Sequence, residues 1–161
     1  MPVRSLVAGI GNIFLGDDGF GVEVVNRLQR AELPAHVSVA DFGIRGVHLA
    51  FELAGGAYES VILVDTVARG QPPGTLYVID PTTDPDCAGS DADAHSLTPG
   101  AVLAWLRRIG GDCGRITIVG CEPASLDETM GLSAPVAAAV DEAVRLVREL
   151  VTTERTTTSC A

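Results

Sequence analysis

The chain of 161 residues contains no lysine, so its positive charge comes from 11 arginines, which stand against 21 acidic residues. The formal net charge is −10. Proteins that bind nucleic acids or anionic membranes usually carry clusters of basic residues, so this acidic chain is a poor candidate for either. No apolar run approaches the roughly 20 residues that span a bilayer, and the N-terminus shows no signal-peptide pattern. We therefore predict a cytoplasmic protein without nucleic-acid or membrane partners.

Cysteine is also scarce. The four cysteines, Cys87, Cys113, Cys121 and Cys160, fit neither a metal knuckle nor a Cys-x-x-Cys motif. Their scattered positions predict reduced thiols and no disulfide framework. Cys121, at the end of an apolar run, is predicted to be a small buried side chain and not a nucleophile.

What the sequence does have is apolar segments of two kinds, in a composition that is 47% hydrophobic. Short β-branched runs predict strands, and apolar residues at helical spacing predict helices. The predicted strands are 3–9, 36–42, 60–67, 75–80 and 115–121; the predicted helices are 19–31, 46–54, one starting at 98–99 and one starting after Ser133. We expect one domain over 1–151 and a frayed tail over 152–161, where the apolar pattern stops.

The third helix has a clear start signal. Thr98 is expected to cap it and Pro99 to occupy its first position. Val102, Leu106 and Ile109 then mark the side of this helix that we expect to be buried.

Alternation of strands and helices predicts an α/β fold, a three-layer sandwich with helices on both faces of a twisted, mostly parallel five-stranded sheet. The link between the strands at 60–67 and 75–80 is too short for a parallel crossover. We therefore expect the strand at 75–80 to run antiparallel to the strand at 60–67.

Ligands of open α/β sheets bind beyond the carboxyl ends of the strands, and three polar residues are predicted to lie there. Asp18 follows the first strand, Asp65 ends the third, and His95 precedes the third helix. Asp65 interrupts an otherwise apolar run, where an ionised carboxylate without a partner is costly. The sequence therefore indicates a site formed by Asp18, Asp65 and His95.

Two carboxylates and an imidazole suit a divalent transition metal such as nickel, zinc, manganese or iron. The other two histidines are less suited, because His36 opens a strand at the opposite edge and His48 lies within a helix. The Gly-rich turn at 9–21 suggests a dinucleotide site as an alternative. Two adjacent aspartates in that turn would repel phosphates, so a tight turn is the favoured interpretation.

Five segments resemble, in order and spacing, the motifs of the hydrogenase maturation endopeptidases. The first, Gly9–Gly21 (GIGNIFLGDDGFG), resembles their opening motif, and Val61–Asp65 (VILVD) resembles their second acidic motif. His95–Leu97 resembles their histidine motif. Gly120–Pro123 (GCEP) and Gly131–Ser133 (GLS) are similar to their late Gly-x-x-Pro and Gly-Leu-Ser patterns.

The resemblance implies a monomeric peptidase that clips the C-terminal extension from the large-subunit precursor of a nickel–iron hydrogenase, once nickel has been inserted. It implies that Asp18, Asp65 and His95 are both the metal-contacting and the catalytic residues, with nickel carried by the precursor. Asp17 and Asp41 are second-line candidates. Such a metal could polarise the scissile carbonyl, deliver a hydroxide, or serve only as a recognition point.

The segment after Asp41 departs from the Gly-Gly-Thr-like stretch of that family, since Phe42 and Arg45 add bulk and positive charge. We therefore expect Arg45 to contribute to the choice of substrate. Alternative functions are a non-catalytic nickel metallochaperone, another metal-dependent hydrolase on the same scaffold, and a nucleotide-binding module.

Overall fold

The computed structural model describes residues 4–84, 98–111 and 114–158, and within them a sheet of five strands forms the middle layer. The strands lie in the order β2-β1-β3-β5-β4. Their bounds are β1 (Ser5–Ile10), β2 (Val37–Gly43), β3 (Ser60–Thr66), β4 (Leu76–Ile79) and β5 (Arg115–Cys121).

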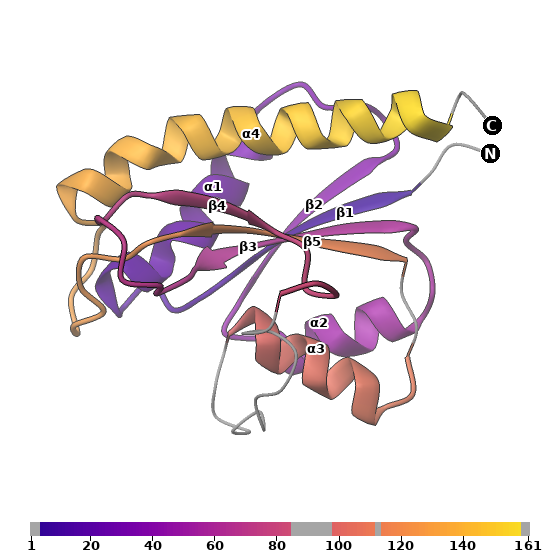
Figure 1. The fold of residues 1–161 in the computed structure, drawn as a ribbon, viewed down its shortest axis with the longest axis horizontal. Coiled ribbons are helices and arrows are strands. Elements are labelled where there is room, and N and C mark those ends of the chain that lie inside the picture. Colours follow the sequence, from indigo (N-terminus) through magenta and orange to yellow (C-terminus); the bar gives the residue numbers. More distant parts are fainter. Residues whose placement is uncertain (1–3, 85–97, 112–113, 159–161) are drawn as a thin grey trace.

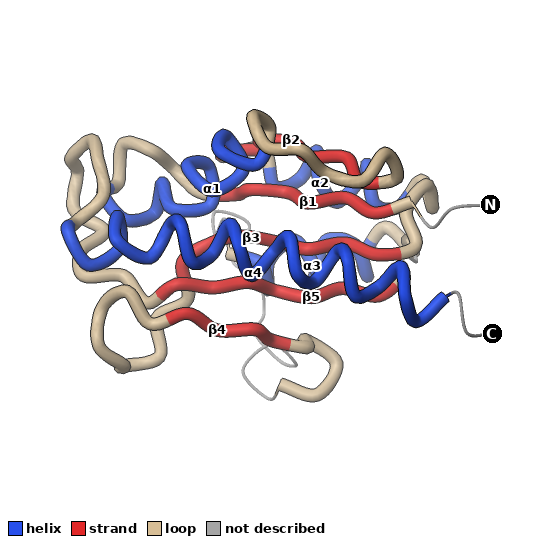
Figure 2. Tube along the Cα trace, turned by 90° about the horizontal axis from the view of Figure 1, so that it is seen from above, coloured by secondary structure: helices blue, strands red, loops and turns tan. Residues whose placement is uncertain are grey.

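Helices cover both faces of this sheet, as Figure 1 shows. Helices α1 and α4 lie on one face, and α2 and α3 lie on the other. Figure 2, from above, shows the strands side by side beneath α4. The helices are the 3-10 turn η1 (Gly16–Gly19), α1 (Phe20–Leu28), α2 (Gly46–Ala54), α3 (Pro99–Arg108) and α4 (Ala134–Thr158). The predicted α/β three-layer sandwich is confirmed.

The apolar run of β3 explains its central place, because its first six residues are buried and both faces meet helices. Ile62 and Val64 face the core under α1 and α4, whereas Val61 and Leu63 face the core under α2 and α3. The strand therefore contributes to both hydrophobic layers, and its carboxyl end lies at the middle of the sheet edge.

Strands β2, β1, β3 and β5 are parallel, whereas β4 runs antiparallel to its neighbour. The predicted direction of the fourth strand is confirmed. Its neighbour, however, is β5 and not β3, because β5 itself pairs with β3 from Ser60 to Thr66. This order places β4 at the edge of the sheet and the ends of β1 and β3 next to one another.

Some predicted boundaries differ from the structure. Helix α4 continues to Thr158, so residues 152–158 are helical where we expected a frayed tail. Thr98 caps α3 with its side chain as predicted, but Ile109 follows the helix and is 40% exposed. No helix in the described segments has the length and hydropathy needed to cross a membrane.

Candidate active site

The Gly-rich turn after β1 brings α1 very close to the sheet. A Cβ atom on Gly21 would collide with the carbonyl oxygens of Val64 and Ile10, so only glycine permits this approach. A Cβ atom on Gly11, whose φ is +132°, would collide with the backbone of Asp18. Packing therefore accounts for these glycines without a bound phosphate, which supports the tight-turn interpretation.

The same turn places Asp18 next to the end of β3, where Asp65 lies. Thr66 contacts both carboxylates: its N–H donates to Asp65 Oδ1 at 2.7 Å, and its hydroxyl donates to Asp18 Oδ1 at 3.3 Å. Asp18 Oδ2 also accepts the N–H of Asn12 at 2.7 Å. Two of the three predicted site residues are thus brought together from positions 47 apart in the chain.

Asp65 has an unusual electrostatic setting. Its side chain is buried, with 2% of the residue exposed. Burial and, secondarily, the negative charge of Asp18 raise the pKa of Asp65 well above its usual value, against the opposing effect of Thr66. Two carboxylates that repel one another in this way gain from a cation placed between them. The chemistry of the pair therefore fits a divalent ion.

The third predicted ligand, His95, lies outside the described residues. Within the described segments, no cluster of three or more histidine, cysteine or acidic side chains could hold a metal ion. Asp18 and Asp65 are therefore the two predicted ligands that the described residues bring together, and the assignment of all three as metal ligands stays a prediction.

Asp17, a second-line candidate, has a different environment from its neighbour. Its buried carboxylate accepts the N–H groups of Ala124, Ser125 and Ser133 at 2.7–3.0 Å and the Ser133 hydroxyl at 2.9 Å. Burial by itself raises the pKa of Asp17, but these donors together hold it below its usual value. Asp17 therefore anchors the loop between β5 and α4.

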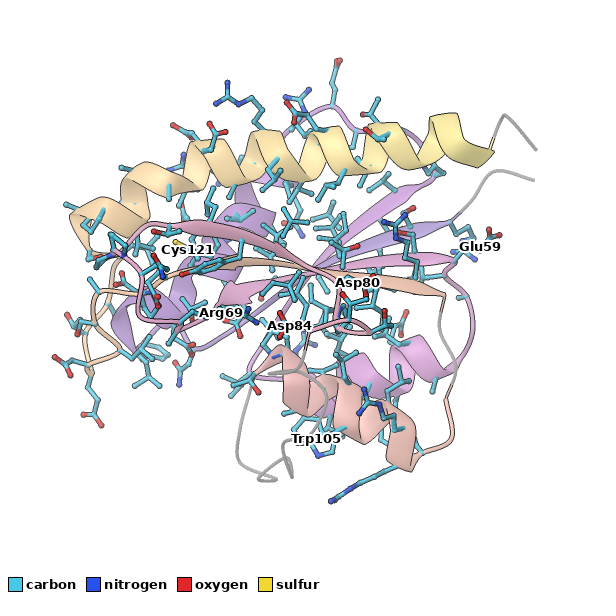
Figure 3. The ribbon with its side chains drawn as sticks, in the orientation of Figure 1. Glu59, Arg69, Asp80, Asp84, Trp105 and Cys121 are labelled. Atoms are coloured by element: carbon cyan, nitrogen blue, oxygen red, sulfur yellow. The ribbon has the colours of Figure 1, made fainter. Side chains whose placement is uncertain are left out.

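Glu122 anchors a second loop in the same way. Its buried carboxylate accepts the N–H groups of Arg69 and Gln71 and the hydroxyl of Tyr77, at 2.6–3.1 Å. Burial raises the pKa of Glu122, but these donors bring it below its usual value. Arg69 also forms an ion pair with Asp84 at 2.9 Å, and Figure 3 labels both residues.

The remaining candidates are Cys121, Asp41 and Arg45. Cys121 is buried, and burial, with smaller effects from Asp17 and Glu122, raises the pKa of its thiol to about 12, which argues against a nucleophile. Asp41 lies near the carboxyl end of β2, at the same edge of the sheet. Its carbonyl oxygen accepts a hydrogen bond from the Arg45 guanidinium at 2.7 Å. Arg45 also lies 5.7 Å from the centre of the Phe42 ring.

Thr66, Glu122 and the anchoring role of Asp17 did not emerge from sequence reasoning. Thr66 directly follows Asp65, and its place as a polar residue at the end of an apolar strand could have marked it as a site residue. Nothing in the local sequence shows that Asp17 and Asp18 face different partners. That difference depends on the loop after β5, more than 100 residues later.

Comparisons with known proteins point to one family. The hydrogenase maturation protease family model, HycI, matches residues 22–150. The hydrogenase 2 maturation protease of Escherichia coli is 33% identical over 147 residues, covering 90% of this chain and 88% of that protein. HupD of Rhodobacter capsulatus, a hydrogenase expression/formation protein, is 35% identical over 154 residues, covering 91% and 72%.

Solved structures show the same fold. The hydrogenase-maturating endopeptidase HybD of Escherichia coli superposes with a TM-score of 0.77 at 29% identity, covering 94% of this chain and 93% of that one. A hydrogenase 2 maturation peptidase from a Thaumarchaeota archaeon superposes with a TM-score of 0.68 at 37% identity, covering 92% and 97%. Sequence and fold together lead to one conclusion: this chain belongs to the hydrogenase maturation protease family.

Proposed function

We propose that this chain is an endopeptidase that removes the C-terminal extension of a nickel-loaded hydrogenase large-subunit precursor. The observation that carries the proposal is the Asp18–Asp65 pair, in which two repelling carboxylates lie at the carboxyl edge of a maturation-protease fold. The relatives named above supply the substrate class. Cytoplasmic location, a monomeric state and the absence of membrane or nucleic-acid partners stay predictions.

In this proposal nickel belongs to the precursor and is the feature by which the substrate is recognised. Asp18 and Asp65 contact it, and His95 is the proposed third contact. Thr66 holds the two carboxylates in their relative positions through its N–H and hydroxyl. Carboxylates and imidazole together form a ligand set that accepts nickel(II). We propose that this contact with nickel brings the three residues to the peptide bond to be cut.

The test is intact mass spectrometry of a nickel-loaded precursor incubated with this protein. We expect the loss of a C-terminal peptide with the wild-type protein, and no loss from the metal-free precursor. The His95→Ala variant should leave the precursor intact. An unchanged mass together with stable binding of the nickel-loaded precursor would instead indicate a metallochaperone.

A further inference from the structure

Four large apolar side chains are exposed on the two loops that flank the Asp18–Asp65 pair. They lie in the segment between β1 and η1 and in the segment between β5 and α4. We name them the apolar rim; they are Ile13 (41% exposed), Phe14 (60%), Leu126 (47%) and Met130 (67%). Single exposed apolar residues are common, whereas a group of them marks an interaction surface.

The two loops that carry the apolar rim are paired with one another. Leu15 and Thr129 form a parallel bridge, and the Gly16 N–H donates to the Thr129 carbonyl at 2.8 Å. Phe14 and Met130 are each one residue from this bridge. Figure 1 shows both loops at the same end of the molecule.

Leu126 belongs to the same surface, because the chain on both sides of it lies against Gly16. A Cβ atom on Gly16 would come within 2.9 Å of the Ser125 carbonyl and 3.4 Å of the Asp127 carbonyl. Ile13 lies against Gly19, the last residue of η1. The four residues therefore lie on two adjoining loops beside Asp18.

This region is held in place from beneath. The Asp17 carboxylate accepts four hydrogen bonds from the loop between β5 and α4, and the Asp17 N–H donates to the Ser125 carbonyl at 3.0 Å. A hollow of about 250 Å³ lies in the same place, lined in part by Gly16, Thr129 and Met130. The buried, hydrogen-bonded carboxylate of Asp17 thus fixes the two loops that expose the apolar rim to solvent.

The charge around the apolar rim indicates the charge of the surface that binds to it. Segments 10–19 and 122–133 contain no arginine, lysine or histidine, and Asp127 and Glu128 are exposed within the second. A second copy of this chain, with a net charge of −10, would meet this surface with charge of the same sign. The complementary surface is apolar and bordered by basic side chains.

We propose that the apolar rim docks the folded body of the hydrogenase large-subunit precursor, through an apolar patch bordered by arginine or lysine beside its C-terminal segment. This inference rests on the proposed function. Docking at the rim binds the precursor body at a distance from the scissile bond, with the C-terminal segment leading toward the Asp18–Asp65 pair. The rim therefore contributes to the affinity for the precursor and not to the cleavage step itself.

The test compares cleavage kinetics of a nickel-loaded precursor by two rim variants and a matched control. Phe14→Ser and Met130→Ser should each raise KM about tenfold while kcat stays unchanged. The control is Phe51→Ser, because Phe51 is 61% exposed on α2, away from the rim. Circular dichroism and thermal melting establish that all three variants are folded.

A charge variant tests the sign of the partner surface. Raising the salt concentration should increase KM for the wild-type protein, because opposite charges are screened. Glu128→Arg should raise KM at low salt and reduce this salt dependence.

The outcomes separate this proposal from the proposed function. If the wild-type protein cleaves no nickel-loaded precursor, the proposed function fails and the docking proposal fails with it. If the wild-type protein cleaves and both rim variants keep its KM, only the docking proposal is overturned. An increased KM for Phe51→Ser with unchanged rim variants would overturn it in favour of the α2 face. Conversion of a wild-type dimer to a monomer by Phe14→Ser would overturn it in favour of self-association.

Discussion

Asp17 and Asp65 are both buried carboxylates at the carboxyl edge of the same sheet, and their surroundings act on them in opposite directions. Asp17 accepts four hydrogen bonds, and these donors hold its pKa below the usual value against the effect of burial. Asp65 accepts a hydrogen bond from the Thr66 N–H and faces the charge of Asp18. Burial and that charge raise its pKa.

The difference shows that one edge of the sheet carries both a carboxylate that stabilises a loop and a pair of carboxylates suited to bind a ligand. A buried carboxylate with a full set of donors is stable as an anion and fixes the loop that supplies the donors. A buried carboxylate beside a second carboxylate lacks that compensation, so a cation or a proton stabilises it. Asp18 and Asp65 are therefore suited to receive a ligand, and Asp17 is suited to hold the loop beside them.

Replacing Asp65 should produce the largest change in activity. Asp65→Asn removes one of the two carboxylates proposed to contact the nickel ion, and we expect kcat/KM for precursor cleavage to fall by about 100-fold or more. The free energy of unfolding should stay the same or rise, because burial and the charge of Asp18 disfavour the ionised form of Asp65. Precursor cleavage followed by mass spectrometry, together with urea unfolding, measures both.

Asp141→Asn is the control for this prediction, since Asp141 is exposed on α4 and far from the site in sequence. Equal activity of Asp65→Asn and Asp141→Asn would contradict the assignment of Asp65 to the site.

Replacing Asp17 should have its main effect on stability. Asp17→Asn exchanges one acceptor oxygen for an amide donor, which faces either the N–H of Ser133 or the N–H groups of Ala124 and Ser125. Leaving such buried donors without a charged acceptor should lower the free energy of unfolding by roughly 2 to 3 kcal/mol. Urea unfolding measures this loss, and faster amide exchange in segment 122–133 should accompany it. Unchanged exchange there would show that Asp17 does not anchor the loop.

The anchoring role of Glu122 predicts a specific pH dependence. Its folded-state pKa lies below the ordinary value of 4.5, so its contribution to stability is present above that pH and is lost as the pH falls through the lowered pKa. The difference in unfolding free energy between the wild-type protein and Glu122→Gln should therefore shrink on acidification. Glu149→Gln, exposed on α4, is the control and should show no such convergence.

The smallest effect is expected at Arg45. Its guanidinium donates to the Asp41 carbonyl and lies over the Phe42 ring, so it is held within its own loop at the edge of the site. We expect Arg45→Ala to change KM for the cognate precursor and to leave kcat unchanged. If Arg45→Ala processes that precursor at the wild-type rate, Arg45 does not contribute to the choice of substrate.

Much of the fold follows from local patterns. The helix at 46–54 and the strand at 115–121 have the predicted bounds, because glycine and apolar spacing mark both ends. The end of α4 was missed because residues 152–158 lack an apolar stripe, yet they continue a helix already formed. The neighbour of β4 was left open by the sequence, because two apolar strands compete for the same edge of β3 and local sequence does not decide between them.

The sequence by itself determined the α/β class, the family motifs and the candidates Asp18 and Asp65, since apolar periodicity and polar residues at strand ends are local features. Tertiary structure alone decided that Asp17 anchors a loop while Asp18 turns toward Asp65. It also decided that Thr66 links the two carboxylates and that Glu122 fixes the loop before β4. The physical reason is that the partners of a buried carboxylate set its role, and these partners come from distant parts of the chain.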